Sequence, residues 1–117
     1  MAAEVKRGEI WTVAGGPGYT GKPRPAAIVQ DDSFDATASI TICPFTTRAV
    51  GAPLVRLAIE PSERNGLLAE SHLMVDKITT VSKGKLEKRV GCLSDQDLVR
   101  LNRGVLVFLG LVRSGTK

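Results

Sequence analysis

An arginine held between two prolines is the residue of this sequence whose position most suggests chemistry. Arg24 lies in "KPRP" at 22–25, directly before the apolar run 26–30. Proline fixes its own φ angle, and the residue before a proline is restricted to extended backbone angles. The guanidinium of Arg24 therefore starts from a constrained backbone, and its planar set of donors suits a phosphate group. The alternative is a charge at a strand edge with an exposed tip.

Two hydroxyl groups and a carboxylate are also placed where they could act on a ligand. Thr46 and Thr47 follow the strand predicted over 39–44, where free backbone N–H groups could bind an oxyanion together with the hydroxyls. Asp76 lies within the mostly apolar segment 71–81. A charge there costs free energy unless it is paired or exposed. An ordinary turn is the alternative for the threonines, and a salt bridge for Asp76.

Several other kinds of site find no support in the sequence. There is no phosphate-binding loop, zinc-ligand spacing or serine-hydrolase motif. The single histidine, His72, excludes a pair of histidines as separate acid and base within one chain, and its place at a strand start is typical of a half-exposed structural residue. Cys43 and Cys92 are too far apart for a metal clip or a CxxC pair, so both are predicted to be structural. We expect neither a metal nor another cofactor.

The elements that must position these residues are short strands. Alternating or continuous apolar residues predict five of them, over 8–14, 26–30, 39–44, 54–60 and 71–81, the last with an irregularity near Asp76. A loop rich in glycine and proline fills 15–25. Because parallel strands need crossovers of a dozen or more residues, the short connections favour antiparallel pairing.

A helix closes the chain. Ser94 is a good N-cap, Asp95 and Asp97 lie in the first turn, and apolar residues follow at helical spacing, namely Leu98, Leu101, Val105, Leu106 and Leu109. The predicted fold is mainly β: a small SH3-like or barrel-like antiparallel sheet, with an amphipathic helix over 94–111 lying on it.

Length and charge limit the possible partners. A chain of 117 residues predicts one domain over 1–117. Lys and Arg number 16 against 12 Asp and Glu, which gives +4 and favours an anionic partner. The basic segment 77–89 is either a solvated turn between strands or a surface for nucleic acid or an acidic protein. With no signal peptide and no apolar run of about 20 residues, we expect a cytoplasmic protein without a membrane partner.

Five segments, in order and spacing, resemble the MazF/PemK family of toxin ribonucleases, also called mRNA interferases. They are "KRGEIWTV", "KPRPAAIVQ", "ITICPFTT", "NGLLAESHLMVDKITTV" and "KRVGCLSDQDLVRLNRGVLVFLGL", and they cover Lys6 to Leu111. The resemblance implies a homodimer that cuts single-stranded RNA at short sequence motifs without a metal. In that reaction the ribose 2′-OH attacks the adjacent phosphate, leaving a 2′,3′-cyclic phosphate and a 5′-OH. It also implies a MazE-like antitoxin, whose acidic, disordered tail would lie along the basic groove.

The resemblance assigns catalytic roles to two residues. The arginine of the family's "RP" falls on Arg24, which would stabilise the pentacoordinate phosphorane and could act as an acid. The threonine after the proline falls on Thr46, a ligand of the phosphate, with Thr47 as a weaker neighbour. Donors aimed at developing charge can supply several kcal/mol of transition-state stabilisation.

The resemblance assigns RNA contacts to a second group. Asp76 matches an aspartate that some members place at the substrate groove, and Lys77 and Lys22 would hold the RNA backbone. In the loop before "RP" some members have a Glu or His proposed as base. Here Tyr19 and Thr20 are the hydrogen-bonding side chains besides Lys22. Tyrosine is a poor base at neutral pH, but Tyr19 could stack on a nucleobase.

The sequence departs from the family pattern at two points, and two alternative functions are compatible with it. Met74 stands where some members have an arginine, and the general base is not identified. A CcdB-like toxin, which binds and poisons DNA gyrase without catalysis, has the same fold, although the C-terminal "GLVRSGTK" lacks an aromatic anchor. The other alternative is an inactive family member that acts only as a binding module.

Overall fold

Short strands and one long helix make up the part of the chain that the computed structural model describes, residues 4–15, 22–52 and 54–113. The elements in these residues are β1 (Glu9–Val13), β2 (Arg24–Ile28), the 3₁₀ helix η1 (Asp32–Phe34), β3 (Ser39–Thr46), β4 (Arg56–Ile59), β5 (Ser71–Met74), η2 (Val75–Lys77), β6 (Thr79–Ser82), η3 (Lys83–Lys85), β7 (Leu86–Cys92) and α1 (Asp95–Phe108).

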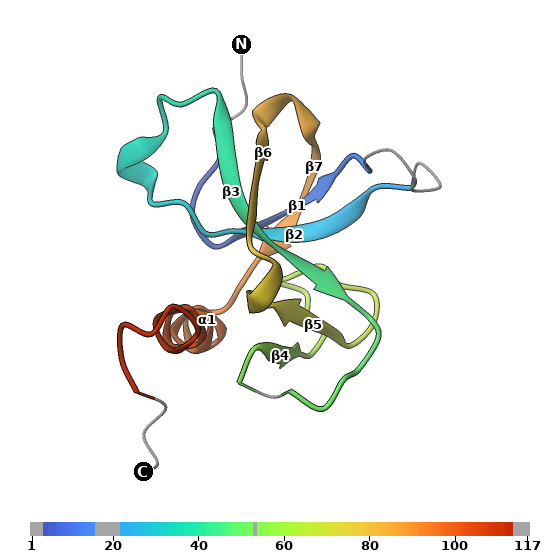
Figure 1. The fold of residues 1–117 in the computed structure, drawn as a ribbon. Coiled ribbons are helices and arrows are strands. Elements are labelled where there is room, and N and C mark those ends of the chain that lie inside the picture. Colours follow the sequence, from blue (N-terminus) through green and yellow to red (C-terminus); the bar gives the residue numbers. More distant parts are fainter. Residues whose placement is uncertain (1–3, 16–21, 53, 114–117) are drawn as a thin grey trace.

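The strands pair antiparallel in the order β4-β5-β3-β2-β1-β7, and β6 pairs with β3 outside this path. The long strand β3 joins two parts of the sheet. Its middle pairs with β2, its first half with β6, and its last two residues, Phe45 and Thr46, with β5. Figure 1 shows β4 and β5 below the crossing strands β1 and β2, with the end of β3 reaching β5. The predicted antiparallel sheet with a C-terminal helix is confirmed.

Both faces of β3 are buried, which explains its near-continuous run of apolar and β-branched residues. Ile40 and Ile42 belong to an apolar cluster formed with residues of β1 and β2. Cys43 and Phe45 point to the opposite face and join a second cluster, to which α1 contributes Leu101 with an exposed fraction of 0%. The sheet therefore separates two cores, and only the second is covered by the helix.

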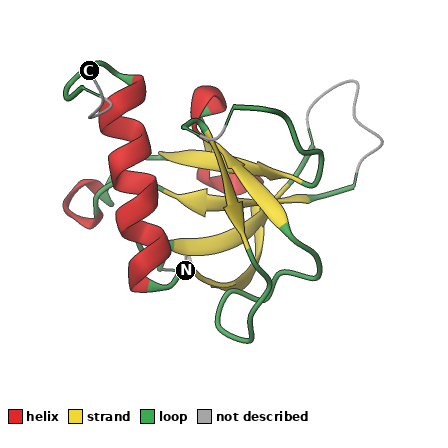
Figure 2. Cartoon of the chain, turned by 90° about the horizontal axis from the view of Figure 1, so that it is seen from below, coloured by secondary structure: helices red, strands yellow, loops and turns green. Residues whose placement is uncertain are grey.

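The helix α1 begins as predicted and lies along one side of the sheet (Figure 2). The Oγ of Ser94 accepts a hydrogen bond from the backbone N–H of Asp97 at 3.1 Å, so the predicted N-cap is confirmed. The helix ends at Phe108 and not at residue 111, because Gly110 has a φ of +76°. In the described parts of the chain, no helix is both long and apolar enough to cross a membrane.

The apolar stripe of α1 is buried only in part. Leu98 and Val105 pack against the core around Leu101. Leu106 and Leu109, at the C-terminal end, are 40% and 61% exposed. The prediction that the whole stripe lies on the sheet is therefore wrong for this last turn.

Two predictions about strands are also wrong. The segment 71–81 was expected to be one strand with an irregularity near Asp76. It is instead two strands, β5 and β6, separated by the 3₁₀ helix η2, which contains Asp76. The basic segment 77–89 is more than a turn, because it contains β6, η3 and half of β7. Strand β7 pairs with β1 at the edge of the sheet. The sequence of β7 lacks the alternation of buried and exposed residues that predicts a strand, because Lys88 and Arg89 are both exposed.

Candidate active site

Arg24 and Thr46 are brought together by the register of β2 and β3. Ala26 lies opposite Pro44 in this antiparallel pair. Arg24 lies two residues before Ala26, and Thr46 lies two residues after Pro44, so both side chains project to the same face of the sheet. Residues 22 positions apart in the sequence are therefore placed on the same side of one groove.

These two side chains line a groove with a volume of about 510 Å³. Its polar wall consists of Arg24, Thr46, Lys77 and Thr79. Apolar residues from four strands also line it, namely Val13, Ala26, Ile42 and Val81. The groove thus has an apolar part that belongs to the first core cluster and a polar rim that carries two cationic side chains. Such a surface suits a ligand that has both flat apolar groups and phosphates.

Arg24 is the first residue of β2 and not part of the preceding loop, which corrects the predicted strand start at residue 26. It pairs with Val13 of β1, and Pro25 pairs with Thr12. The registered pairs of β2 with β3 begin only at Ala26. Proline is tolerated where a strand has a partner on one side only. Arg24 is exposed, so its guanidinium starts from a fixed strand and reaches the mouth of the groove.

Thr46 is the last residue of β3, whereas the predicted strand ended at residue 44. Its Oγ1 accepts a hydrogen bond from the backbone N–H of Arg48 at 3.1 Å. Because the oxygen is engaged as an acceptor, the hydroxyl can donate its proton to a ligand oxygen. Thr47 follows the strand, is exposed, and is not among the described residues that line the groove.

The helix η2 places the neighbours Asp76 and Lys77 in different cavities. Lys77 is exposed and lines the groove of Arg24 and Thr46. The carboxylate of Asp76 instead accepts two hydrogen bonds from Arg56, from Nε at 2.8 Å and from Nη2 at 3.0 Å. The hydrogen bond from Arg56 lowers the pKa of Asp76 below its usual value of 3.8. Of the two interpretations of Asp76, the salt bridge is the one observed here.

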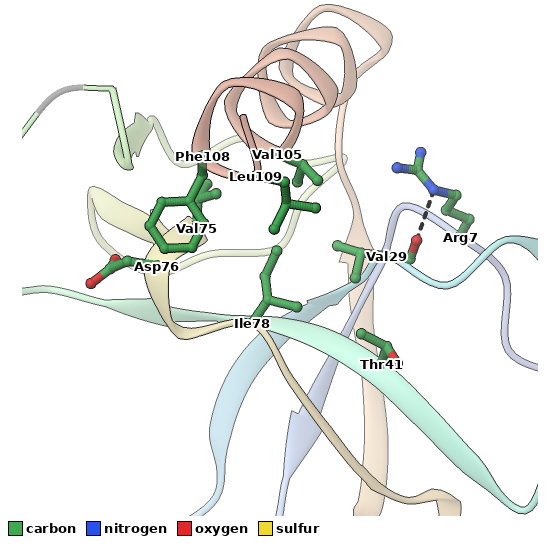
Figure 3. A pocket seen from close by; sticks show the side chains of 9 residues that line it. All are labelled: Arg7, Val29, Thr41, Val75, Asp76, Ile78, Val105, Phe108 and Leu109. Carbon is green, nitrogen blue, oxygen red and sulfur yellow. Dashed lines mark hydrogen bonds between the residues drawn. The ribbon is translucent and has the colours of Figure 1, made fainter. Parts of the chain in front are cut away.

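Asp76 lines a second cavity of about 340 Å³ beneath the end of α1. Figure 3 shows this cavity, with Phe108 and Leu109 of the helix facing Val75 and Ile78. The carboxylate lies at its edge and points away from these apolar side chains. The cation of this cavity among the described residues is Arg7, whose Nε donates to the carbonyl of Val29 and whose Nη2 donates to Oδ1 of Asn102.

The remaining predicted RNA-contacting residues precede Arg24 in the sequence. Tyr19 and Thr20 lie outside the described residues. Lys22 is exposed, two residues before β2, and is not among the described residues that line the groove.

Cysteines and acidic residues form no metal site in the described part of the chain, where no group of three or more His, Cys, Asp or Glu side chains could hold an ion. Cys43 and Cys92 are both free thiols. Cys43 is fully buried, and burial raises the pKa of its thiol to about 12. It therefore acts as a small apolar side chain of the core.

Two residues near this site were not among the predicted site residues: Arg56 was not singled out, and His72 was interpreted as structural. Arg56 is the partner of Asp76, and its position on the polar face of the alternating segment 54–60 was the available signal. His72 lies directly opposite Thr46 in the pairing of β3 with β5. Only the register of two strands more than 20 residues apart reveals this neighbour, so no local pattern could have found it.

Comparison with known proteins gives one family. The model of the family described as "PemK-like, MazF-like toxin of type II toxin-antitoxin system" matches residues 6–109. A probable endoribonuclease MazF of Mycolicibacterium smegmatis is 54% identical over 107 residues, which cover 92% of this chain and 98% of that protein.

Solved structures share the fold. A mycobacterial endoribonuclease in complex with its cognate antitoxin has a TM-score of 0.75 at 24% identity, over 92% of this chain and 96% of that chain. A MazE–MazF complex of Deinococcus radiodurans has a TM-score of 0.78 at 18% identity, over 94% and 99% of the two chains. At these identities the structures establish the fold alone.

Proposed function

The chain belongs to the family of PemK-like, MazF-like toxins of type II toxin–antitoxin systems, and we propose that it is a sequence-specific endoribonuclease that cleaves single-stranded RNA. The observation that carries this proposal is the joining of Arg24 and Thr46 in one groove with a cationic rim. A probable endoribonuclease is identical to this chain at 54% of the aligned positions. The similarity to MazF proteins does not favour the alternative of a gyrase-binding toxin without catalysis.

In the proposed reaction the 2′-OH of a ribose attacks the adjacent phosphorus atom. A bond forms between the 2′ oxygen and phosphorus, and the bond between phosphorus and the 5′ oxygen breaks. The products are a 2′,3′-cyclic phosphate and a 5′-OH. Negative charge builds up on the non-bridging oxygens during this step, and hydrogen-bond donors already in place stabilise it without reorganisation. The chemistry proposed here uses no metal.

Arg24 and Thr46 are the proposed donors. The guanidinium of Arg24 offers two parallel N–H groups to the phosphorane. The hydroxyl of Thr46, whose oxygen already accepts from Arg48, donates to another phosphate oxygen. Neither group needs to change its protonation state to do so.

Further contacts hold the RNA strand. Lys77 on the groove and Lys22 before β2 neutralise neighbouring phosphates. Thr47, Tyr19 and Thr20 are proposed to contact the nucleotides on either side of the cleaved bond. Asp76, held by Arg56, contributes indirectly by fixing the backbone next to Lys77.

The biological setting belongs to the same proposal. The protein acts in the cytoplasm as a homodimer, inhibits translation and growth by cutting mRNA, and is neutralised by a cognate MazE-like antitoxin. The net charge of +4 and the cationic rim of the groove support an acidic antitoxin segment as its occupant.

Sequencing the 5′ ends of cellular RNA after induction tests this function. We expect new 5′-OH ends at one recurring short motif when the parent protein is induced. An induced Arg24→Ala protein at the same level should produce none of these ends. New ends that are equally frequent with both proteins, or growth inhibition by the parent without any new ends, would contradict the proposal.

A further inference from the structure

The single histidine of the chain lies beside the proposed phosphate ligand. In the pairing of β3 with β5, His72 is directly opposite Thr46, and Leu73 is opposite Phe45. Residues directly opposite each other in an antiparallel pair project to the same face, with Cβ atoms about 4.5–5.5 Å apart. Met74, two residues further along β5 on that face, lines the groove. The side chain of His72 therefore lies next to that of Thr46, the proposed ligand of the phosphate.

One nitrogen of this ring has no evident structural use. The Nδ1 atom of His72 is buried and has no hydrogen-bond partner among the described residues. Buried side-chain nitrogens are nearly always paired, and an exception is often a group retained for function. In a neutral imidazole, the hydrogen bond that one ring nitrogen makes normally determines which of the two nitrogens carries the proton. Among the described residues, no hydrogen bond of Nδ1 fixes the ring of His72, and the residue is only partly buried.

His72 is not itself among the described residues that line the groove, but it pairs with Thr46, which is. Among the described residues that line the groove there is no carboxylate. Arginine and lysine side chains act as hydrogen-bond donors and not as acceptors, so neither Arg24 nor Lys77 is a candidate base. The nearby carboxylate of Asp76 is bound at both oxygens by Arg56 and lies at the other cavity.

We propose that His72 is the general base of the RNA cleavage step, an inference that rests on the function proposed above. The imidazole accepts the proton of the 2′-OH while the 2′ oxygen forms its bond to phosphorus. The bond to the 5′ oxygen breaks, and the leaving oxygen takes a proton from water. The imidazolium then returns its proton to the solvent, so that atoms and charge balance over one turnover.

Single-turnover cleavage of a long, end-labelled single-stranded transcript tests this role. General base catalysis contributes about 100-fold to 10,000-fold in rate, so His72→Ala should slow cleavage by at least about 100-fold. His72→Gln, which keeps a polar side chain of similar size, should be equally slow. Both variants should bind 2′-O-methyl RNA of the same sequence as tightly as the parent. Melting curves that match the parent's show that neither variant has lost its fold.

Chemical rescue separates a base from a structural residue. Free imidazole in the buffer should restore part of the rate of His72→Ala and none of the rate of Arg24→Ala. Cleavage by His72→Ala at the parent's rate would overturn the inference, and so would a loss of rate matched by an equal loss of RNA affinity. A parent protein that cleaves no RNA would overturn both the proposed function and this inference, whereas an active parent with an equally active His72→Ala overturns the inference alone.

Discussion

Arg56 and Asp76 form a two-point ion pair across β4 and η2, in which Nε and Nη2 of the arginine donate to Oδ1 and Oδ2 of the aspartate at 2.8 and 3.0 Å. Their side chains are 15% and 27% exposed. The backbone N–H of Val75 also donates to the carbonyl of Val55 at 2.8 Å. The ion pair and this bond fix the turn that directs Lys77 to the groove.

Removing this ion pair should destabilise the protein at neutral pH. Asp76→Ala leaves the partly buried guanidinium of Arg56 without its acceptor, at an expected cost of about 1–3 kcal/mol in the free energy of unfolding. Urea unfolding at pH 7 measures this change. Glu4→Ala, which breaks the exposed pair with Lys6, is the matched control and should cost clearly less than Asp76→Ala, because solvent screens an exposed pair. Equal costs for the two variants would contradict the importance assigned to the ion pair.

The same ion pair predicts a pH dependence. The pKa of Asp76 in the folded protein is below its usual value of 3.8, so the folded state binds this proton less readily than the unfolded state does. The stabilisation is therefore complete above that usual value and is lost as the pH falls through the folded pKa. Asp76→Asn should reduce the loss of stability on acidification between pH 5 and pH 2, as measured by urea unfolding. Parallel curves for Asp76→Asn and the parent would contradict this assignment.

Lys77 should contribute to RNA binding through charge. Lys77→Ala should weaken binding to single-stranded RNA and lower the slope of log K against log salt by about 0.7, the value for one phosphate contact on a single strand. Lys83→Ala is the matched control, because the Nζ of Lys83 donates to the carbonyl of Asp35 and Lys83 lines a separate cavity. Fluorescence anisotropy over a salt series measures both slopes. The same slope for Lys77→Ala and the parent would place Lys77 outside the RNA path.

Features that depend on residues close together in the sequence were predicted correctly, whereas features that depend on residues far apart in the sequence were not. The helix and its Ser94 cap were predicted correctly because cap, charge and periodicity are local signals. Strand β7 was missed because it lies at the sheet edge, and its pairing with β1 involves residues more than 70 positions away. The split at η2 was indicated only as an irregularity, since it depends on a partner, Arg56, contributed by another strand.

The candidate site shows the same division. Arg24 and Thr46 stood out in the sequence because proline neighbours and hydroxyls at a strand end are visible locally. Their position in one groove follows from the register of β2 and β3, which only the fold supplies. Sequence reasoning set His72 aside as structural for the same reason, because its neighbour Thr46 is 26 positions away and lies on another strand.

The helix should be held to the sheet mainly by Leu101. This side chain is completely buried in the core cluster, so Leu101→Ala should lower the free energy of unfolding by about 2–5 kcal/mol. Val99 lies on the same helix with 65% of its surface exposed, and Val99→Ala should change stability by no more than about 0.5 kcal/mol. Thermal or urea unfolding of the two variants measures the contrast. A small effect of Leu101→Ala would show that α1 does not depend on this contact.

Cys43 should resist thiol reagents as long as the protein is folded. Its thiol is buried, and the raised pKa of about 12 leaves almost no thiolate at pH 8. A colorimetric thiol reagent should therefore modify at most one of the two cysteines in the native protein and both in denaturant. The Cys92→Ser variant serves as the control and should give no native signal. Fast modification of Cys43 in folded Cys92→Ser would contradict its place in the core.

The most direct test of the central claim is cleavage of single-stranded RNA by the purified protein in EDTA, with analysis of the product ends. The account predicts cleavage to a 2′,3′-cyclic phosphate and a 5′-OH by the parent. Arg24→Ala should lose nearly all activity, and Arg24→Lys should recover only part of it because an ammonium group lacks the planar pair of donors. Both variants should melt as the parent does. Full activity of Arg24→Ala, or no cleavage by the parent protein, would contradict the account.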